Sequence, residues 1–197
     1  MQVPVYIAAG GLSRRMGQDK AQLLLAGRPL VLRVADSLAP WACRVTAVVD
    51  QPGRLAGLGL RECVDGGTHQ GPLLALAAAL DDLQPEEDWL LLAPCDVVGL
   101  ERIDWGLLGR ARCPQDQAAA FVQDRWQPLP ALYHRSLKSL IAQRLAQGDR
   151  SLRGLLDAAR ARGVAAPEQW QDLQPVNTQA QLLLAEAKLL SIPQENL

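Results

Sequence analysis

The feature that most constrains the fold of this chain is a short apolar run that ends directly in a glycine-rich loop. Residues Val3–Ala9 are largely apolar, with β-branched and aromatic members, and they predict a buried β-strand. The loop over residues 10–20 holds three glycines, two adjacent arginines and a lysine. Glycines allow sharp turns and close approach of a ligand, free backbone N–H groups bind anions, and cationic side chains favour phosphate. Because open α/β sheets bind ligands where strands end, this segment predicts a phosphate site.

The same composition is also typical of an ordinary solvent-exposed turn, so that alternative stays open on composition alone. Known phosphate motifs do not match. A Walker loop ends in Gly-Lys-Ser/Thr, whereas Gln18 and Asp19 separate Gly17 from Lys20 here. The dinucleotide fingerprint G-x-G-x-x-G is also missing from the sequence. The loop therefore predicts a phosphate site of another kind, and one of the only three lysines of the chain lies in it.

Predicted strands alternate with predicted helices over the first hundred residues. After the first strand we expect a helix, two strands, a second helix and a fourth strand, over Pro29–Leu38, Val45–Val49, Arg61–Val64, Pro72–Leu83 and Trp89–Ala93. Such alternation indicates an α/β fold with a Rossmann-like, doubly wound and mostly parallel sheet.

The second half of the chain has a different pattern. Ala118–Val122 and Leu129–Tyr133 predict two strands joined as a hairpin or crossing pair, which adds an antiparallel element to the sheet. Helices are expected over Leu137–Ala146, over Leu152–Ala161, and from Thr178, which forms a capping box with Gln181, to about Leu190, with a frayed tail from Ser191. The segment between the halves is poor in Gly and Pro, so we expect a single domain over residues 1–197.

Charge, hydropathy and cysteine usage exclude several classes of protein. The net charge of −1 argues against a general binder of nucleic acid or membrane surfaces. No apolar run reaches the ~18 residues that span a bilayer, and no basic segment precedes the first apolar run, as it would in a secretory signal. The widely spaced cysteines predict buried, reduced thiols in a cytoplasmic protein rather than a zinc site or disulfides; they are Cys43, Cys63, Cys95 and Cys113.

The glycine loop resembles the N-terminal signature of the nucleotidyltransferases that load a nucleotide onto the molybdenum cofactor, roughly L-A-G-G-x-S-x-R-M-G-x-D-K-A. The matching residues are Ala8, Ala9, Gly10, Gly11, Ser13, Arg15, Met16, Gly17, Asp19, Lys20 and Ala21. Ala8 stands where the guanylyltransferase branch usually has Leu. The resemblance implies that GTP binds at Ala8, Ala9, Gly10, Gly11 and Lys20. It also implies that Arg15 and Lys20 stabilise the departing pyrophosphate.

Asp96 is the strongest acidic candidate because it follows the C-terminal end of a predicted buried strand. A carboxylate at this edge suits Mg²⁺, which takes one or two protein carboxylates together with phosphate oxygens and water. The alternative is an aspartate that caps the next turn or helix. Pro94-Cys95-Asp96 resembles the P-C-D motif of the same family, in which the aspartate binds magnesium and GTP, although Val97-Val98 replaces the usual x-Pro.

Asp65 bears on the choice of base. Guanine presents N–H donors on its Watson–Crick edge, so a carboxylate is a suitable partner, whereas Asp65-Gly66-Gly67 can also be read as a simple turn. Asp65 with the later Gly71-Pro72-Leu73 resembles the D…G-P-L segment of the guanylyltransferases, in which the aspartate contacts GTP. The cytidylyltransferase relatives usually have Ser-Leu in place of Pro-Leu. An asparagine that binds GTP in relatives has no clear match, since Val48 and Asp50 are both candidates for its position.

The resemblance is thinner toward the C-terminus. Segments 127–133, 150–152 and 176–178 match family patterns in part, and in relatives they line the pterin side of the cleft. Asn177 is therefore a candidate acceptor contact, although a structural role in a turn is equally compatible with the sequence. On this basis residues 1–100 are expected to form the nucleotide-binding half and residues 101–197 the acceptor-binding half.

The resemblance implies a molybdenum cofactor guanylyltransferase that transfers GMP from GTP to the phosphate of molybdopterin and uses Mg²⁺. Arg15, Lys20 and Asp96 are the expected catalytic residues. The chain has two histidines, and a substrate phosphate that is already anionic needs no general base. Transient contact with cofactor-delivery or acceptor proteins is expected, and binding to nucleic acid or membranes is not. The alternatives are a cytidylyltransferase acting on the same cofactor and a protein that binds a nucleotide or pterin without catalysis.

Overall fold

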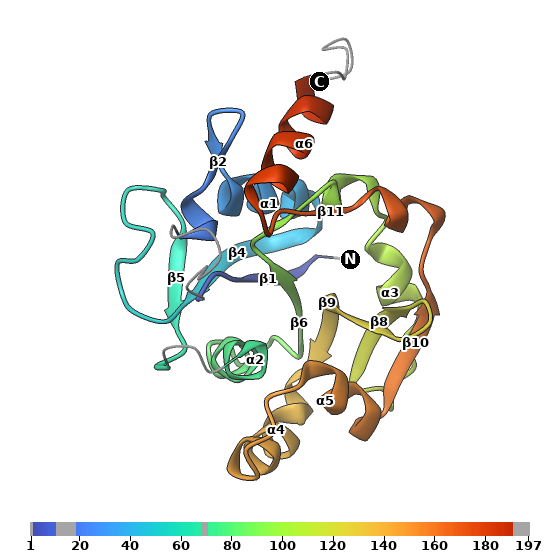
Figure 1. The fold of residues 1–197 in the computed structure, drawn as a ribbon. Coiled ribbons are helices and arrows are strands. Elements are labelled where there is room, and N and C mark those ends of the chain that lie inside the picture. The colour runs from blue at the N-terminus through green and yellow to red at the C-terminus, as the bar shows by residue number, and fades with distance from the viewer. Residues whose placement is uncertain (1, 11–18, 68–70, 191–197) are drawn as a thin grey trace.

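The structure is a computed structural model and describes residues 2–10, 19–67 and 71–190 (Figure 1). Within these residues the main sheet has seven strands in the order β10-β8-β9-β6-β1-β4-β5. Strand β9 runs antiparallel to both of its neighbours, and the other pairs are parallel. The strands are β1 (Val3–Ala8), β4 (Ala42–Val49), β5 (Arg61–Val64), β6 (Trp89–Pro94), β8 (Ala118–Val122), β9 (Trp126–His134) and β10 (Ala161–Ala165).

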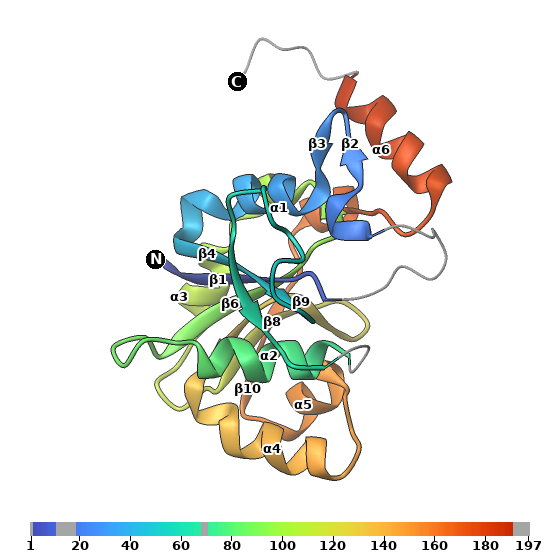
Figure 2. The same ribbon diagram turned by 90° about the vertical axis from the view of Figure 1, so that its left-hand side faces the viewer.

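Helices cover both faces of this sheet, as Figure 1 and Figure 2 show. Helices α1 (Leu30–Leu38) and α3 (Gly106–Ala111) pack on one face. Helices α2 (Pro72–Asp81), α4 (Lys138–Ala146) and α5 (Leu152–Ala158) pack on the other. The sheet is therefore the middle layer of a three-layer α/β fold.

The first strand shows why the sequence forms this arrangement. Successive side chains of a strand point to opposite faces, so Val5 and Ile7 pack in the core beneath α1, whereas Tyr6 packs in the core beneath α2. All three are 0% exposed. A central parallel strand is buried on both faces, which explains why this segment is a continuous apolar run.

A smaller group of elements extends the α1 face. The short hairpin of β2 (Leu24–Leu25) and β3 (Arg28–Pro29) packs against α6 (Gln179–Leu190) around a third apolar cluster. The backbone N–H of Ala26 at the hairpin tip donates to Glu186 Oε1 at 3.0 Å. This hydrogen bond joins the hairpin to α6, the last helix of the described chain, and Figure 2 shows the two side by side.

The predicted fold class is confirmed: the sheet is mostly parallel, and the antiparallel β8–β9 pair is the predicted added element. The capping box is confirmed in part. The backbone N–H of Gln181 donates to Thr178 Oγ1 at 3.2 Å, while Gln181 Oε1 accepts from the backbone of Asn177 at 2.8 Å. The prediction of fraying from Ser191 falls outside the described residues. Of the helices described, none has the length and apolar character to span a bilayer.

Three local predictions are wrong. The helix expected to reach Ala161 ends at Ala158, and the next residues form β10, because pairing with β8 outweighs the local helical pattern. Pro29 belongs to β3 and precedes α1, so it is not the first residue of the helix. The cysteines are not fully buried: Cys43 is exposed, since its strand leaves the core near its start, and the other three are half-buried.

Candidate active site

The candidate site lies where the parallel strands of the sheet end. The backbone N–H of Ala9 donates to Val48 O at 2.8 Å, and the N–H of Asp65 donates to Val49 O at 2.9 Å. These bonds extend the pairing of β1, β4 and β5 past their last residues. The segments that leave these strands therefore start side by side at one edge of the sheet, where open α/β sheets bind ligands.

Gly10 allows the backbone to approach its neighbours closely at this edge. A Cβ built at this position would lie 3.0 Å from Asp50 N and 3.4 Å from Asp65 Oδ2. The first of these contacts is with backbone, which has little freedom to move. The predicted need for glycine at the beginning of the loop thus has a local cause at Gly10. Gly11 and Arg15, which were predicted to contact the nucleotide, lie outside the described residues.

Lys20, Asp96 and Asn177 form the polar centre of the site. Lys20 Nζ lies 3.1 Å from Asp96 Oδ2 and donates to Asn177 Oδ1 at 2.5 Å. The side chains of Lys20 and Asp96 are only 21% and 22% exposed, so the ion pair is partly shielded from water. The structure therefore brings together two predicted catalytic residues and the predicted acceptor contact.

Backbone pairing holds Asn177 beside Asp96 despite the 81 positions between them. The short strands β7 (Val97–Val98) and β11 (Gln174–Pro175) pair antiparallel. The N–H of Val176 donates to the carbonyl of Asp96 at 2.7 Å. The neighbouring Cys95 plays no acid–base part, because burial raises the pKa of its thiol to about 12 and keeps it protonated.

Asp65 stands at the end of β5. Its Oδ1 accepts from the N–H of Gly67 at 3.1 Å, so Asp65 does stabilise a turn. A structural role in this turn is compatible with a second role in binding a ligand. Burial raises the pKa of Asp65, and the Gly67 hydrogen bond opposes this effect. Asp65 also lines a hollow of about 410 Å³ between β5 and α2, together with Cys63, Val64, Leu74, Ala77, Ala78, Asp81 and Asp82.

A second ion-pair network joins the loop end to the sheet edge. Arg54 Nε donates to Asp19 Oδ2 at 2.8 Å, and Arg54 Nη1 donates to Asp50 Oδ1. Burial alone would lower the pKa of Arg54, but the two carboxylates reverse this effect and raise it, so the guanidinium stays charged. Sequence reasoning missed Arg54, because it lies in an ordinary turn and nothing local signals its partners.

Val48 and Asp50, the two candidates for the family's asparagine, are now distinguishable. Val48 is 0% exposed and its side chain packs in the core, so it does not reach the edge. Asp50 lies at the edge, beside Gly10. His134 is far from this region, because it pairs with Trp89 at the opposite end of β6 from Asp96. Its imidazole contacts the ring of that tryptophan in a tilted arrangement, at a centroid distance of 4.9 Å.

The donor set of the polar centre fits a hard divalent cation. Among the described residues, no group of three or more His, Cys, Asp and Glu converges on one point. However, the Asp96 carboxylate and the Asn177 amide oxygen both contact one cationic group, the Lys20 ammonium. Mg²⁺ prefers oxygen donors and takes few from protein, so these two residues match its usual protein share.

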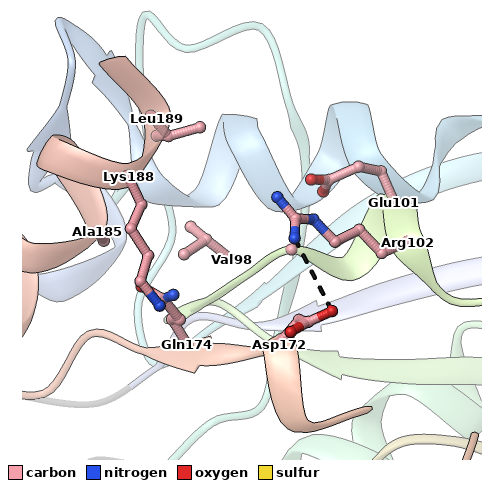
Figure 3. Close-up of a pocket in the computed structure, with 9 residues that line it drawn as sticks. Val98, Glu101, Arg102, Asp172, Gln174, Ala185, Lys188 and Leu189 are labelled. Carbon is pink, nitrogen blue, oxygen red and sulfur yellow. Dashed lines mark ion pairs between the residues drawn. The ribbon is translucent and has the colours of Figure 1, made fainter. Parts of the chain in front are cut away.

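A separate pocket of about 80 Å³ lies on the other side of the β7–β11 pair, against α6 (Figure 3). Arg102 Nη1 and Asp172 Oδ2 lie 3.9 Å apart there. Because their side chains are 45% and 48% exposed, this ion pair contributes little to the stability of the fold. The lining does not include Lys20, Asp96 or Asn177; it consists of Val98, Gly99, Glu101, Arg102, Asp172, Gln174, Ala185, Lys188 and Leu189.

Comparison with known proteins places this chain, with its mostly parallel sheet and with Gly10, Lys20 and Asp96 at the C-terminal edge of that sheet, among the nucleotidyltransferases. The chain belongs to the MobA-like NTP transferase domain family, whose sequence model matches residues 5–167. It is 37% identical over 169 residues to a probable molybdenum cofactor guanylyltransferase of Synechococcus elongatus, covering 79% of this chain and 84% of that protein. It is 35% identical to a molybdenum cofactor guanylyltransferase of Yersinia pestis, covering 92% and 94%.

Solved structures support the fold. Molybdopterin-guanine dinucleotide biosynthesis protein A from Archaeoglobus fulgidus superposes with a TM-score of 0.76 at 19% identity, covering 96% of this chain and all of that one. The 2-C-methyl-D-erythritol 4-phosphate cytidylyltransferase of Thermus thermophilus gives a TM-score of 0.68 at 20% identity, covering 96% and 100%. At these identities the likeness concerns the fold alone.

Proposed function

We propose that this protein transfers GMP from GTP to the phosphate of molybdopterin, releasing pyrophosphate and leaving a guanine dinucleotide form of the cofactor. The observation that carries the proposal is the convergence of Lys20, Asp96 and Asn177 on one point at the sheet edge. Relatives that share about a third of their residues with this chain, over most of its length, are named molybdenum cofactor guanylyltransferases.

The triphosphate is proposed to lie against the glycine-rich segment between Gly10 and Lys20. Ala8, Ala9, Gly10 and Gly11 would contribute backbone contacts, and Arg15 and Lys20 would stabilise the negative charge on the departing pyrophosphate. The ammonium of Lys20 sits on a flexible stem, which lets it follow a phosphate as bonds change. Its present partners, Asp96 and Asn177, place it at the centre of the site.

Asp96 and Asn177 are the residues that would hold Mg²⁺. When bound, the ion would supply positive charge that neutralises the reacting phosphates. Asp96 is well suited to this role, because its main-chain carbonyl is fixed by Val176 and its side chain points at the polar centre. Asn177 is proposed to act both here and toward the acceptor, the second role being the one that the resemblance implies.

Guanine is proposed to lie toward Asp65. The carboxylate accepts hydrogen bonds only, so it suits the N–H donors on the Watson–Crick edge of guanine. Its Oδ2 is directed toward Gly10, which leaves this oxygen beside the proposed path of the nucleotide. On this arrangement residues 1–100 form the nucleotide-binding half of one domain and residues 101–197 the acceptor-binding half.

The reaction needs no general base from the protein. An oxygen of the molybdopterin phosphate, already anionic near neutral pH, attacks the α-phosphorus of GTP. The new P–O bond forms as the bond to pyrophosphate breaks, and the electron pair leaves with pyrophosphate. Alignment and charge neutralisation carry such a transfer. We propose a cytoplasmic location, because all four cysteines, each in the described part of the chain, are free thiols. Transient contact with proteins that deliver or receive the cofactor fits this role.

Pyrophosphate release in the presence of GTP, Mg²⁺ and molybdopterin tests the proposal directly. We expect release that depends on all three, and a product that contains GMP and molybdopterin. Preference for CTP over GTP would instead identify a cytidylyltransferase. Tight binding of nucleotide with no pyrophosphate release would identify a binding protein without catalytic activity, and either result would contradict the proposal.

A further inference from the structure

Arg54 joins two parts of the site that are distant in the sequence. Its side chain is only 6% exposed, although it lies in the turn between β4 and β5. Its guanidinium donates to Asp19 from Nε and to Asp50 from Nη1. Hydrogen bonds between charged groups are roughly twice as strong as those between neutral groups. One guanidinium therefore connects the residue before Lys20 with the residue that follows β4.

On the loop side, these contacts reach the turn that carries Lys20. Asp19 caps the 3₁₀ turn Lys20–Gln22, since its Oδ1 accepts from the N–H of Ala21 at 3.1 Å while its Oδ2 accepts from Arg54. Gln22 Nε2 also donates to the carbonyl of Arg54 at 2.9 Å. Both the side chain and the backbone of Arg54 are thus attached to this turn.

On the sheet side, the same guanidinium binds the carboxylate of Asp50, which directly follows β4. The Asp50 side chain is 7% exposed. Its backbone N and Asp65 Oδ2 both face the Cβ position of Gly10, at 3.0 and 3.4 Å. A displacement of Asp50 would therefore change the packing around Gly10, next to which Asp65 also lies. Arg54 thus spans the gap between the lysine turn and the base side of the site.

Charge neutralisation alone does not explain this geometry. A lysine carries the same charge, but as a single point, whereas the planar fork of arginine holds two carboxylates in fixed directions. The two acceptors here come from segments 31 positions apart, and each receives a different nitrogen of the fork. The arrangement is therefore suited to holding a distance as well as a charge.

We infer that Arg54 is a positioning residue for the transfer reaction: it holds the Lys20 turn at a fixed place relative to Asp50 and Asp65, so that phosphates and base are bound in register. The part of this inference that concerns GTP rests on the proposed function. The part that concerns the placement of Lys20 does not, because it follows from contacts within the chain.

The placement of Lys20 is testable by NMR of the full chain labelled with ¹⁵N-lysine. The chain has only three lysines, Lys20, Lys138 and Lys188, so their ammonium signals are separable. In Arg54→Met we expect the Lys20 signal to move, because its hydrogen bonds to Asp96 and Asn177 are disturbed, while the other two signals stay in place. If Arg54→Met does not fold, Arg54→Met combined with Asp50→Asn removes the more buried of the two carboxylate charges left unpaired and gives the same readout.

Arg61→Met is the matched control. Arg61 also binds a carboxylate, with Nη2 of Arg61 donating to Asp82 Oδ1 at 2.7 Å, but this pair does not include the lysine turn. We expect its Lys20 signal to match that of the unaltered protein. An unchanged Lys20 signal in Arg54→Met, or an equal change in Arg61→Met, would overturn the inference.

Kinetics with GTP test the second part. In Arg54→Met we expect kcat/KM for GTP to fall about 10- to 100-fold, mostly through KM, because small misplacements remote from the chemistry have effects of this size. Arg54→Lys keeps the charge, so it should regain the thermal stability of the unaltered protein but not its KM. Recovery of KM together with stability would show that Arg54 only neutralises charge, contrary to the inference.

The two hypotheses fail in different ways. If the unaltered protein releases no pyrophosphate, the proposed function is wrong, yet a Lys20 shift confined to Arg54→Met still supports positioning. If the protein is active and both the Lys20 signal and KM are unchanged in Arg54→Met, the proposed function stands and positioning by Arg54 is wrong.

Discussion

At the scale of single residues, the site depends on one ammonium held between two oxygens. Lys20 contacts the carboxylate of Asp96 and the amide of Asn177, and both partners come from the C-terminal edge of the sheet. A charged group in this position stabilises negative charge on phosphate most where water is partly excluded. If the proposed function is correct, loss of one of these side chains should affect turnover far more than folding.

Replacing Lys20 by Ala should lower the rate of pyrophosphate release about 100-fold, which is the usual cost of removing one group that stabilises transition-state charge. The midpoint of thermal unfolding should change little. Lys138→Ala is a suitable control, because Lys138 forms an exposed pair with Asp81 at 2.9 Å. Full activity of Lys20→Ala would show that its assigned role is wrong.

Asp65 predicts a pH dependence of GTP binding. Only the ionised carboxylate accepts both guanine donors, and burial raises the pKa of Asp65. Affinity for GTP should therefore fall as the pH is lowered, beginning at a higher pH than for an exposed aspartate. Asp65→Asn should bind GTP about 10- to 150-fold less tightly at neutral pH and lack this acid limb, since a lost hydrogen bond to a charged group costs about 1.5–3 kcal/mol.

Ionisation of Asp65 favours GTP binding but has the opposite effect on the stability of the fold. A raised pKa in the folded state means that ionised Asp65 disfavours folding at neutral pH, so Asp65→Asn should not lower the thermal midpoint. Asp81→Asn is the control, because Asp81 lines the same hollow with a side chain 74% exposed. Equal loss of GTP affinity in both variants would contradict the assignment of the base to Asp65.

At the scale of elements, the ends of strands decide where the functional residues lie. Strands β1, β4, β5 and β6 run parallel, so the segments that follow them leave from one edge. The β7–β11 pair then places the start of α6 at the same edge, although α6 is the last helix of the described chain. The site is thus formed by element ends, while the element interiors form the core.

Gly10→Ala tests how closely these ends must pack. The added methyl group would lie 3.0 Å from Asp50 N, so β1 and β4 must separate at the edge. We expect a loss of about 1–3 kcal/mol in unfolding free energy, measured by urea denaturation, together with weaker GTP binding.

Gly163→Ala, at the far edge strand β10, is the matched control for this substitution. Its new methyl would meet Val122 Cγ2 at 3.1 Å, a side-chain atom that has more freedom to move. We expect a smaller loss of stability and unchanged GTP binding. A Gly10→Ala protein as stable and as active as the unaltered one would show that the close approach is not needed.

At the scale of the whole molecule, a polar network ties the strands to the C-terminal end of α2. Tyr6, in the central strand, donates to Asp82 Oδ2 at 2.7 Å and accepts from Arg44 at 2.7 Å. Arg61 of the edge strand also binds Asp82. The hydrogen bond from Arg61 lowers the pKa of Asp82 despite the opposing effect of burial. This carboxylate therefore links β1, β4 and β5 to one helix.

The lowered pKa of Asp82 predicts part of the loss of folding stability in acid. Because its pKa is lowered in the folded state, it stabilises the fold above the usual aspartate pKa, and this contribution is lost as the pH falls through the folded value. Asp82→Asn should lower the unfolding free energy by about 1 kcal/mol at neutral pH. The difference from the unaltered protein should vanish in strong acid.

Urea denaturation at several pH values measures this effect. Asp36→Asn is the control, because the Arg28–Asp36 pair is 47% and 57% exposed and such pairs contribute little. A difference between Asp82→Asn and the unaltered protein that persists unchanged in strong acid would show that the ionised carboxylate is not the cause.

Local patterns in the amino-acid sequence were enough to predict the fold class, most of the order of the elements, and the positions of Asp65 and Asp96 at the ends of strands. An apolar run, a turn cluster and an acidic residue at a strand end each depend on adjacent residues, which is why they are readable from the chain alone. The same reasoning missed β10, whose first residue, Ala161, was expected to end a helix, because pairing with the distant strand β8 decides this segment.

Which distant residues meet depends on the folded chain. Folding brings Asn177 onto Lys20 and Asp96, and it places Arg54 between Asp19 and Asp50. The physical reason is that such contacts depend on the order of strands in the sheet and on the pairing of β7 with β11. The order of the strands results from burial of the whole core, so it cannot be deduced from the residues adjacent to a given residue in the sequence.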